Sequence, residues 1–159
     1  MRVVIADDEA LFRDGLARLL ADSGVDAVGT VGTAEELLRK VELTRPDAAI
    51  TDIRMPPTHT DEGLLAAQQL RRSQPRVAVL VLSHYLESHW AMRLLEEHPE
   101  RCGYLLKDRV SDVAVLARAL FLSPRTVETH VRHIMLKLGI GEAADDHRRV
   151  LAGLAYLRA

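Results

Sequence analysis

The sequence is poor in cysteine and contains no long apolar run. Its one cysteine, Cys102, cannot form an intrachain disulfide, and its apolar neighbours predict a buried, reduced thiol. No hydrophobic stretch approaches the length that crosses a membrane, and the start "MRVVIADDEA" becomes acidic at once, unlike a signal peptide. These absences exclude a disulfide framework and predict a cytoplasmic protein with no part in the membrane.

Charge is unevenly distributed, although the formal net charge is only −2. Residues 1–112 contain 14 Lys and Arg against 19 Asp and Glu, whereas residues 113–159 contain 7 against 4. The chain therefore has an acidic part with net charge −5 and a mildly basic part with net charge +3. A basic segment permits a nucleic-acid partner, but charge alone does not establish one. We predict one domain over residues 1–112 and a separate segment over residues 113–159.

Two hydrophobic periods alternate along residues 1–112. Short β-branched runs read "RVVIA", "VDAVGTV", "DAAITDI", "VAVLVLS" and "GYLLK", and helix-like amphipathic stretches separate them. This alternation favours a parallel sheet, because parallel strands need long crossover connections that are usually helical. The predicted fold is α/β, with a doubly wound five-stranded parallel sheet. Ligands of such folds bind at the carboxyl ends of the strands.

Polar side chains stand at the carboxyl ends of four of these predicted strands. In chain order they are Asp7, Asp8, Asp52, Ser83 and Lys107. Three carboxylates at one edge raise one another's pKa unless a cation lies among them, and oxygen ligands suit Mg²⁺. A carboxylate can also attack phosphorus and form an aspartyl phosphate, while Mg²⁺ and a lysine offset the developing charge. We interpret Asp52 as the nucleophile, Lys107 as its charge partner and Ser83 as a hydrogen-bond donor to the phosphoryl group.

The segments that carry these residues resemble a known family. "ADDE", "TDIRMPPTHTDEGL", "VLVLSHY" and "GYLLKD" are similar to the receiver domain of bacterial two-component response regulators. The resemblance covers residues 1–112 and implies a flavodoxin-like fold in which Asp52 receives a phosphoryl group from a cognate histidine kinase. It also implies that Mg²⁺ is held by Asp8, Asp52 and the backbone carbonyl of Arg54, with Asp7 acting through water.

The same resemblance assigns roles to residues on the last two strands. It implies that Lys107 contacts the phosphoryl group, and that Ser83 and Tyr104 are a switch pair that moves on phosphorylation. The loop "MPPTHTDEGL" is longer than in the shortest receivers, which affects access to Asp52. Such a protein is not expected to be an enzyme, beyond Mg²⁺-dependent phosphorylation and dephosphorylation of itself.

The tail carries a second resemblance. The stretch "LSPRTVETHVRHIMLKLGI" is similar to the recognition-helix region of the LuxR-type helix-turn-helix in response regulators of the NarL/FixJ class. Ser123 and Pro124 are typical of a helix start, and an apolar stripe with helical spacing follows them. The exposed side of this all-α segment supplies the candidate DNA contacts Glu128, Thr129, Arg132 and His133. In this family a terminal helix like the last stretch, "ADDHRRVLAGLAYLRA", often mediates dimerisation, which implies a homodimer.

The junction between the two parts departs from the family pattern. "KDRVSDVAV" runs almost directly into "LARALFLSPRTVETHV", without the linker and scaffold helix that family members carry there. A helical segment this short cannot bury its apolar stripes alone, so we expect it to pack on the receiver or on a second copy, or to stay partly disordered. Without its scaffold helix, the segment is expected to bind promoter DNA weakly.

The favoured interpretation is a response regulator that is phosphorylated on Asp52 and controls transcription through its helix-turn-helix. One alternative is a receiver that acts by protein contacts or dimerisation, without competent DNA binding. Another is a haloacid-dehalogenase-like phosphatase, which also uses a strand-end aspartate. That class needs a second aspartate two residues later, where this chain has Arg54.

Overall fold

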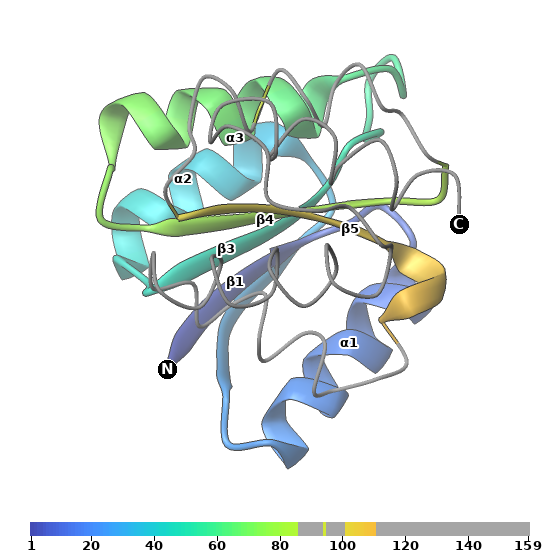
Figure 1. Cartoon of the computed structure of the whole chain (residues 1–159), viewed down its shortest axis with the longest axis vertical. Helices are drawn as coiled ribbons and strands as arrows, with labels where there is room; N and C mark the ends of the chain where they lie inside the picture. The colour runs from blue at the N-terminus through green and yellow to red at the C-terminus, as the bar shows by residue number, and fades with distance from the viewer. Residues whose placement is uncertain (86–93, 95–100, 111–159) are drawn as a thin grey trace, which may run out of the picture.

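A computed structural model of the chain describes residues 1–85, 94 and 101–110 (Figure 1). In this part the strands are β1 (Arg2–Ala6), β2 (Asp26–Val31), β3 (Ala48–Asp52), β4 (Ala78–Ser83) and β5 (Cys102–Leu106). The helices are α1 (Ala10–Asp22), α2 (Ala34–Thr44) and α3 (Glu62–Ser73), and a 3-10 turn, η1 (Lys107–Arg109), follows β5. The predicted helix-turn-helix lies outside the described residues, with its candidate DNA contacts Glu128, Thr129, Arg132 and His133.

The five strands form one parallel sheet in the order β2-β1-β3-β4-β5. Helices α2 and α3 lie on one face of the sheet and α1 lies on the other (Figure 1). This arrangement confirms the predicted doubly wound α/β fold. Because β1 and β3 are neighbours at the centre, the residues that follow them in the chain meet at one edge of the sheet.

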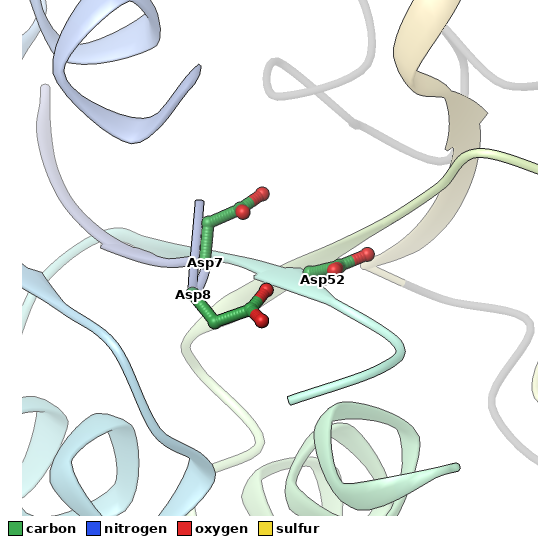
Figure 2. A group of neighbouring side chains, drawn as sticks. All are labelled: Asp7, Asp8 and Asp52. Carbon is green, nitrogen blue, oxygen red and sulfur yellow. The ribbon is translucent and has the colours of Figure 1, made fainter. Parts of the chain in front are cut away.

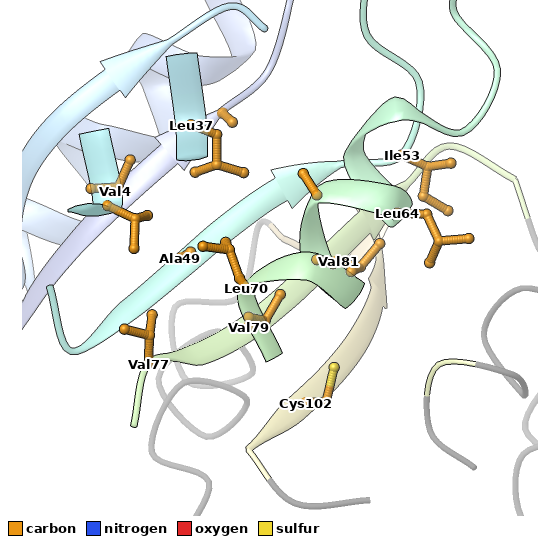
Figure 3. Close-up of a cluster of buried hydrophobic side chains, with 14 of the residues drawn as sticks. Val4, Leu37, Ala49, Ile53, Leu64, Leu70, Val77, Val79, Val81 and Cys102 are labelled. Carbon is orange, nitrogen blue, oxygen red and sulfur yellow. The ribbon is translucent and has the colours of Figure 1, made fainter. Parts of the chain in front are cut away.

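The central strands are buried on both faces, as the helices on each side of a parallel sheet require. Every residue of β3 and β4 is buried. Leu37 of α2, Leu70 of α3 and Val79 of β4 belong to one apolar cluster (Figure 3), while Leu16 and Leu20 of α1 belong to a second. Burial of each leucine stabilises the fold by about 1.5–3 kcal/mol, so the strand ends are held in fixed relative positions.

Strand β5 tests two smaller predictions, one about its first residue and one about its end. Cys102 is its first residue and is a buried free thiol, as predicted, and burial raises the pKa of that thiol to about 12. The strand ends at Leu106, one residue earlier than the predicted run, so Lys107 begins the following 3-10 turn. Among the described residues, no helix has both the length and the apolar character needed to cross a membrane.

Candidate functional site

Three aspartates meet at the carboxyl edge of the sheet. Asp7 and Asp8 follow β1 directly, and Asp52 is the last residue of β3. One carboxylate oxygen from each lies within 4.8 Å of the others, and Figure 2 shows the three side chains extending toward the same side from the ends of β1 and β3. Asp7 is 1% exposed and Asp52 is 5% exposed, whereas Asp8 is partly open to solvent. The predicted meeting of these carboxylates is therefore present in the structure.

Lys107 reaches into this group from the turn after β5. Its Nζ lies 2.8 Å from Asp7 Oδ2 and 3.3 Å from Asp52 Oδ2. Burial lowers the pKa of Lys107, but the contacts with Asp7 and Glu9, together with the negative charges of Asp52 and Asp7, outweigh burial and raise that pKa above its ordinary value. The ring of Phe12 lies beneath the ammonium, 4.7 Å from Nζ to the ring centroid. The lysine is thus held as a buried cation beside the candidate phosphoacceptor.

The charges in this pocket are not balanced by the lysine alone. Burial raises the pKa of Asp52 to about 6; Lys107 opposes the shift and Asp7 adds to it. Burial also raises the pKa of Asp7, again against the effect of Lys107. Both carboxylates therefore bind protons more readily than an exposed aspartate does. A pocket with this property is short of positive charge.

The same residues fit a divalent cation. Mg²⁺ binds oxygen ligands at about 2.0–2.1 Å and usually takes one or two carboxylates together with water. The mutual spacing of the three carboxylate oxygens allows more than one of them to reach a shared ion. Asp7 Oδ2 pairs with Lys107 but receives no well-directed hydrogen bond, so it retains a lone pair for such a ligand. The donor set, all oxygen and mostly anionic, suits Mg²⁺.

The other predicted site residues lie around this centre. Arg54 is exposed, two residues after Asp52, and its guanidinium carbon lies 5.9 Å from the centroid of the Tyr85 ring. Ser83 is buried at the end of β4, and its Oγ donates to the carbonyl oxygen of Tyr85 at 2.9 Å. The hydroxyl of Tyr104, on β5, donates to that same carbonyl, also at 2.9 Å. The two predicted switch residues therefore share one acceptor.

A pair of side chains that the sequence did not predict links the residues after β1 to those after β4. Glu9 Oε1 lies 2.6 Å from His84 Nε2 and 3.0 Å from Lys107 Nζ. The hydrogen bond from His84, and then that from Lys107, lower the pKa of the Glu9 carboxyl. Glu9 is the last letter of the acidic run "ADDE", and His84 directly follows Ser83. Their positions next to predicted site residues were the one feature of the sequence that could have pointed to them.

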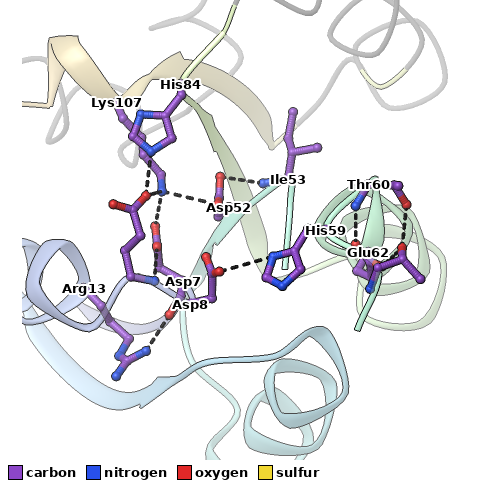
Figure 4. Close-up of polar contacts among 12 residues, drawn as sticks. Asp7, Asp8, Arg13, Asp52, Ile53, His59, Thr60, Glu62, His84 and Lys107 are labelled. Carbon is purple, nitrogen blue, oxygen red and sulfur yellow. Dashed lines mark hydrogen bonds and ion pairs between the residues drawn. The ribbon is translucent and has the colours of Figure 1, made fainter. Parts of the chain in front are cut away.

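The loop between β3 and α3 and the first turn of α3 also contribute unpredicted residues. His59 Nδ1 lies 3.3 Å from Asp8 Oδ2, which places the ring at the open side of the carboxylate group (Figure 4). Gly63 packs against the backbone of Asp52, and an added Cβ there would lie 1.6 Å from the Asp52 carbonyl oxygen. A glycine that follows Asp61 and Glu62 gives no sequence signal of this contact, because the loop must fold back on β3 to create it.

Sequence comparison identifies two families in the chain. Residues 3–116 match the response regulator receiver domain, and residues 112–146 match the luxR family of bacterial regulatory proteins. The second match indicates a helix-turn-helix in the C-terminal part. The two matches overlap at residues 112–116, in agreement with the short junction that the sequence predicts. The division at residue 112 stays a prediction.

Curated relatives and solved structures agree with these matches. The transcriptional regulatory protein LnrK of Bacillus subtilis is 35% identical over 118 residues, which cover 74% of this chain and 51% of LnrK. The oxygen regulatory protein NreC of Staphylococcus haemolyticus is 30% identical over 139 residues, which cover 87% of this chain and 59% of NreC.

The signal receiver domain of NarL from Mycobacterium tuberculosis superposes with a TM-score of 0.63 at 32% identity, covering 76% of this chain and 97% of that domain. The chain spans roughly half to three fifths of the length of the curated relatives it matches. It belongs to the response regulators, with a receiver domain followed by a LuxR-type segment.

Proposed function

We propose that Asp52 accepts a phosphoryl group from a cognate histidine kinase, with Mg²⁺ as the cofactor, and that this modification controls transcription. The observation that carries the proposal is the contact between Asp52 and buried Lys107 inside a group of three carboxylates. Family membership supports it, because the match to the receiver family includes all of these residues. A phosphatase of the haloacid-dehalogenase class is set aside, since Arg54 replaces its second aspartate.

The chemistry follows from the charges of the pocket. An oxygen of the ionised Asp52 carboxylate forms a bond to phosphorus while the phosphorus–nitrogen bond of a phosphohistidine breaks, and the imidazole leaves with the electron pair. Lys107 Nζ, near both Asp52 and Asp7, offsets the negative charge of the transferred group. When bound by Asp8, Asp52 and the backbone carbonyl of Arg54, with Asp7 acting through water, Mg²⁺ would supply further positive charge to the phosphoryl oxygens. Because the pKa of Asp52 is about 6, the metal-free carboxyl is largely ionised at neutral pH.

The switch would act through the carbonyl of Tyr85. A phosphoryl group on Asp52 offers Ser83 a charged acceptor, which is stronger than a neutral carbonyl. Once Ser83 turns toward that group, Tyr104 is the remaining donor to the Tyr85 carbonyl in the described part of the chain, and the end of β4 can change position together with Tyr104. The surface near β5 would change with them and present a new face to a second copy or another partner.

The output that we propose is DNA binding by the C-terminal segment, as a homodimer. The luxR-family match over residues 112–146 favours this over a receiver that acts by protein contacts alone. The candidate contacts to promoter DNA are Glu128, Thr129, Arg132 and His133. With its shortened junction, this chain is proposed to bind DNA weakly, and its own chemistry is proposed to be limited to self-phosphorylation and self-dephosphorylation.

Phosphorylation by a small donor tests the central step. Incubation with acetyl phosphate and Mg²⁺ is expected to add one acid-labile phosphoryl group, visible by intact-protein mass spectrometry. Asp52→Asn should abolish this addition, whereas Asp22→Asn, at the exposed end of α1, should leave it unchanged. Equal labelling of the Asp52→Asn protein would show that another residue is the acceptor.

A further inference from the structure

Asp8 is the least constrained of the three clustered carboxylates. Asp7 and Asp52 each pair with Lys107 and each accept a backbone N–H, at 3.0 Å and 2.9 Å respectively. The Asp8 side chain is 27% exposed, and in the described part of the chain its one side-chain partner is His59. Asp8 Oδ2 lies 3.3 Å from Nδ1 of that ring (Figure 4). The orientation of the Asp8 carboxylate therefore depends on a residue from another loop.

The loop that carries His59 is held on both sides of it. The His59 N–H donates to the carbonyl of fully buried Met55 at 3.0 Å. The carboxylate of Glu62 accepts the backbone N–H groups of Thr58 and Thr60, both at 2.9 Å, and also the Thr58 hydroxyl. His59 itself has a φ of 57°, in the left-handed region. These bonds define the backbone position from which the imidazole reaches Asp8.

We infer that His59 is a positioning residue for the divalent cation, an inference that rests on the proposed Mg²⁺ site. Its Nδ1 contacts Asp8 Oδ2 at 3.3 Å and leaves the second oxygen of that carboxylate for the cation. Carboxylates that bind metals are themselves held by hydrogen bonds, and loss of such an outer partner typically weakens metal binding about 10–100-fold. The long loop "MPPTHTDEGL" thus supplies a partner for Asp8, which follows β1.

Two substitutions distinguish the effect of the His59 side-chain nitrogen from the effect of the backbone conformation at this position. His59→Asn places an amide nitrogen near the position of Nδ1, whereas His59→Gly removes the side chain, and both residues accept a positive φ. Binding of Mg²⁺ to the 159-residue protein is measured by isothermal titration calorimetry, and binding of Mn²⁺ by the electron paramagnetic resonance of the free ion. We expect His59→Asn to keep the wild-type affinity and His59→Gly to bind both ions about tenfold more weakly.

Each result of these binding measurements either supports or overturns the positioning role of His59. Equal affinity of the wild type and His59→Gly would overturn the inference. Tighter binding by His59→Gly would also overturn it, because the ring would then hinder binding of the cation instead of positioning its ligand. Asp8→Asn tests the site itself: if it binds Mg²⁺ as tightly as the wild type, the proposed cation site is wrong, independently of His59. If His59→Gly does not fold, as judged by thermal denaturation in EDTA, His59→Gln replaces it, with the same weaker binding expected because its amide lies near the position of Nε2.

Discussion

Replacing Asp52 with asparagine is expected to stabilise the metal-free protein at neutral pH. Burial, together with the nearby Asp7, raises the pKa of Asp52 from 3.8 to about 6, although Lys107 opposes the shift. This shift is about 2 pKa units, and each unit corresponds to about 1.4 kcal/mol, so the ionised carboxylate destabilises the fold by about 3 kcal/mol. Asparagine has nearly the same shape and carries no charge. The variant therefore avoids this cost.

The effect has a defined dependence on pH. A carboxyl whose pKa is higher in the folded state than in the unfolded state lowers stability above the folded pKa, and this loss disappears as the pH falls below the unfolded value. The gain from Asp52→Asn is thus expected to be about 3 kcal/mol near pH 7.5 and close to zero below about pH 4. Addition of Mg²⁺ should reduce the difference in the free energy of unfolding between Asp52→Asn and the wild type at neutral pH, because the wild type has one more anionic ligand for the ion.

Urea denaturation in EDTA at the two pH values measures this difference. The matched control is Asp22→Asn, a solvent-exposed aspartate at the end of α1, which should change the free energy of unfolding little at either pH. A variant at position 52 that is no more stable than the wild type at neutral pH would refute the account of the pocket as short of positive charge. An equal gain at acid pH would refute it as well.

Four further measurements test other parts of the structure. Gly63→Ala is expected to cost about 1–3 kcal/mol or more in urea denaturation, because its Cβ would overlap the Asp52 carbonyl; Gly15→Ala, at a position with open space, is the control. Burial raises the pKa of Glu62, but hydrogen bonds, chiefly from Thr58, outweigh burial and lower that pKa from 4.5 to about 2. Glu62 therefore stabilises the folded state fully above the pKa that it has in the unfolded chain, and this stabilisation is lost as the pH falls toward 2. Glu62→Gln should flatten this part of the curve of stability against pH. In fluorescence anisotropy, the 159-residue chain is expected to bind a random duplex and a selected palindrome with similarly weak, salt-dependent affinity. Tight binding to the palindrome alone would contradict the predicted absence of the scaffold helix. Beryllium fluoride, a phosphoryl mimic, should change the sedimentation of the protein, and an unchanged profile would argue against the switch at Ser83 and Tyr104.

The parts of the site that depend on strand order were predictable from the sequence. Apolar runs that end at Asp7, Asp52 and Ser83 mark the carboxyl ends of buried strands, and in a parallel sheet those ends meet at one edge. Lys107 follows the last such run, and its contact with Asp7 required nothing beyond this topology. Periodicity therefore sufficed for the carboxylates and the lysine.

The parts that depend on loop conformation were not predictable. His59 reaches Asp8 only because Glu62 and Met55 hold the loop in place, and Gly63 is required by a close backbone approach that no pattern reveals. The pairing of Glu9 with His84 joins loops that are 75 residues apart. Such contacts follow from the turn geometry of long loops, which local sequence specifies poorly.

The most direct test of the central claim is to locate the phosphoryl group on the chain. After incubation with acetyl phosphate and Mg²⁺, borohydride reduces an aspartyl phosphate to homoserine, and peptide mass spectrometry then identifies the position that has changed. We predict homoserine at position 52 in the wild type, with strongly reduced yield when Mg²⁺ is removed. Homoserine at Asp7, at Asp8 or at no position in a folded protein that binds Mg²⁺ would contradict the assignment of Asp52 as the phosphoacceptor.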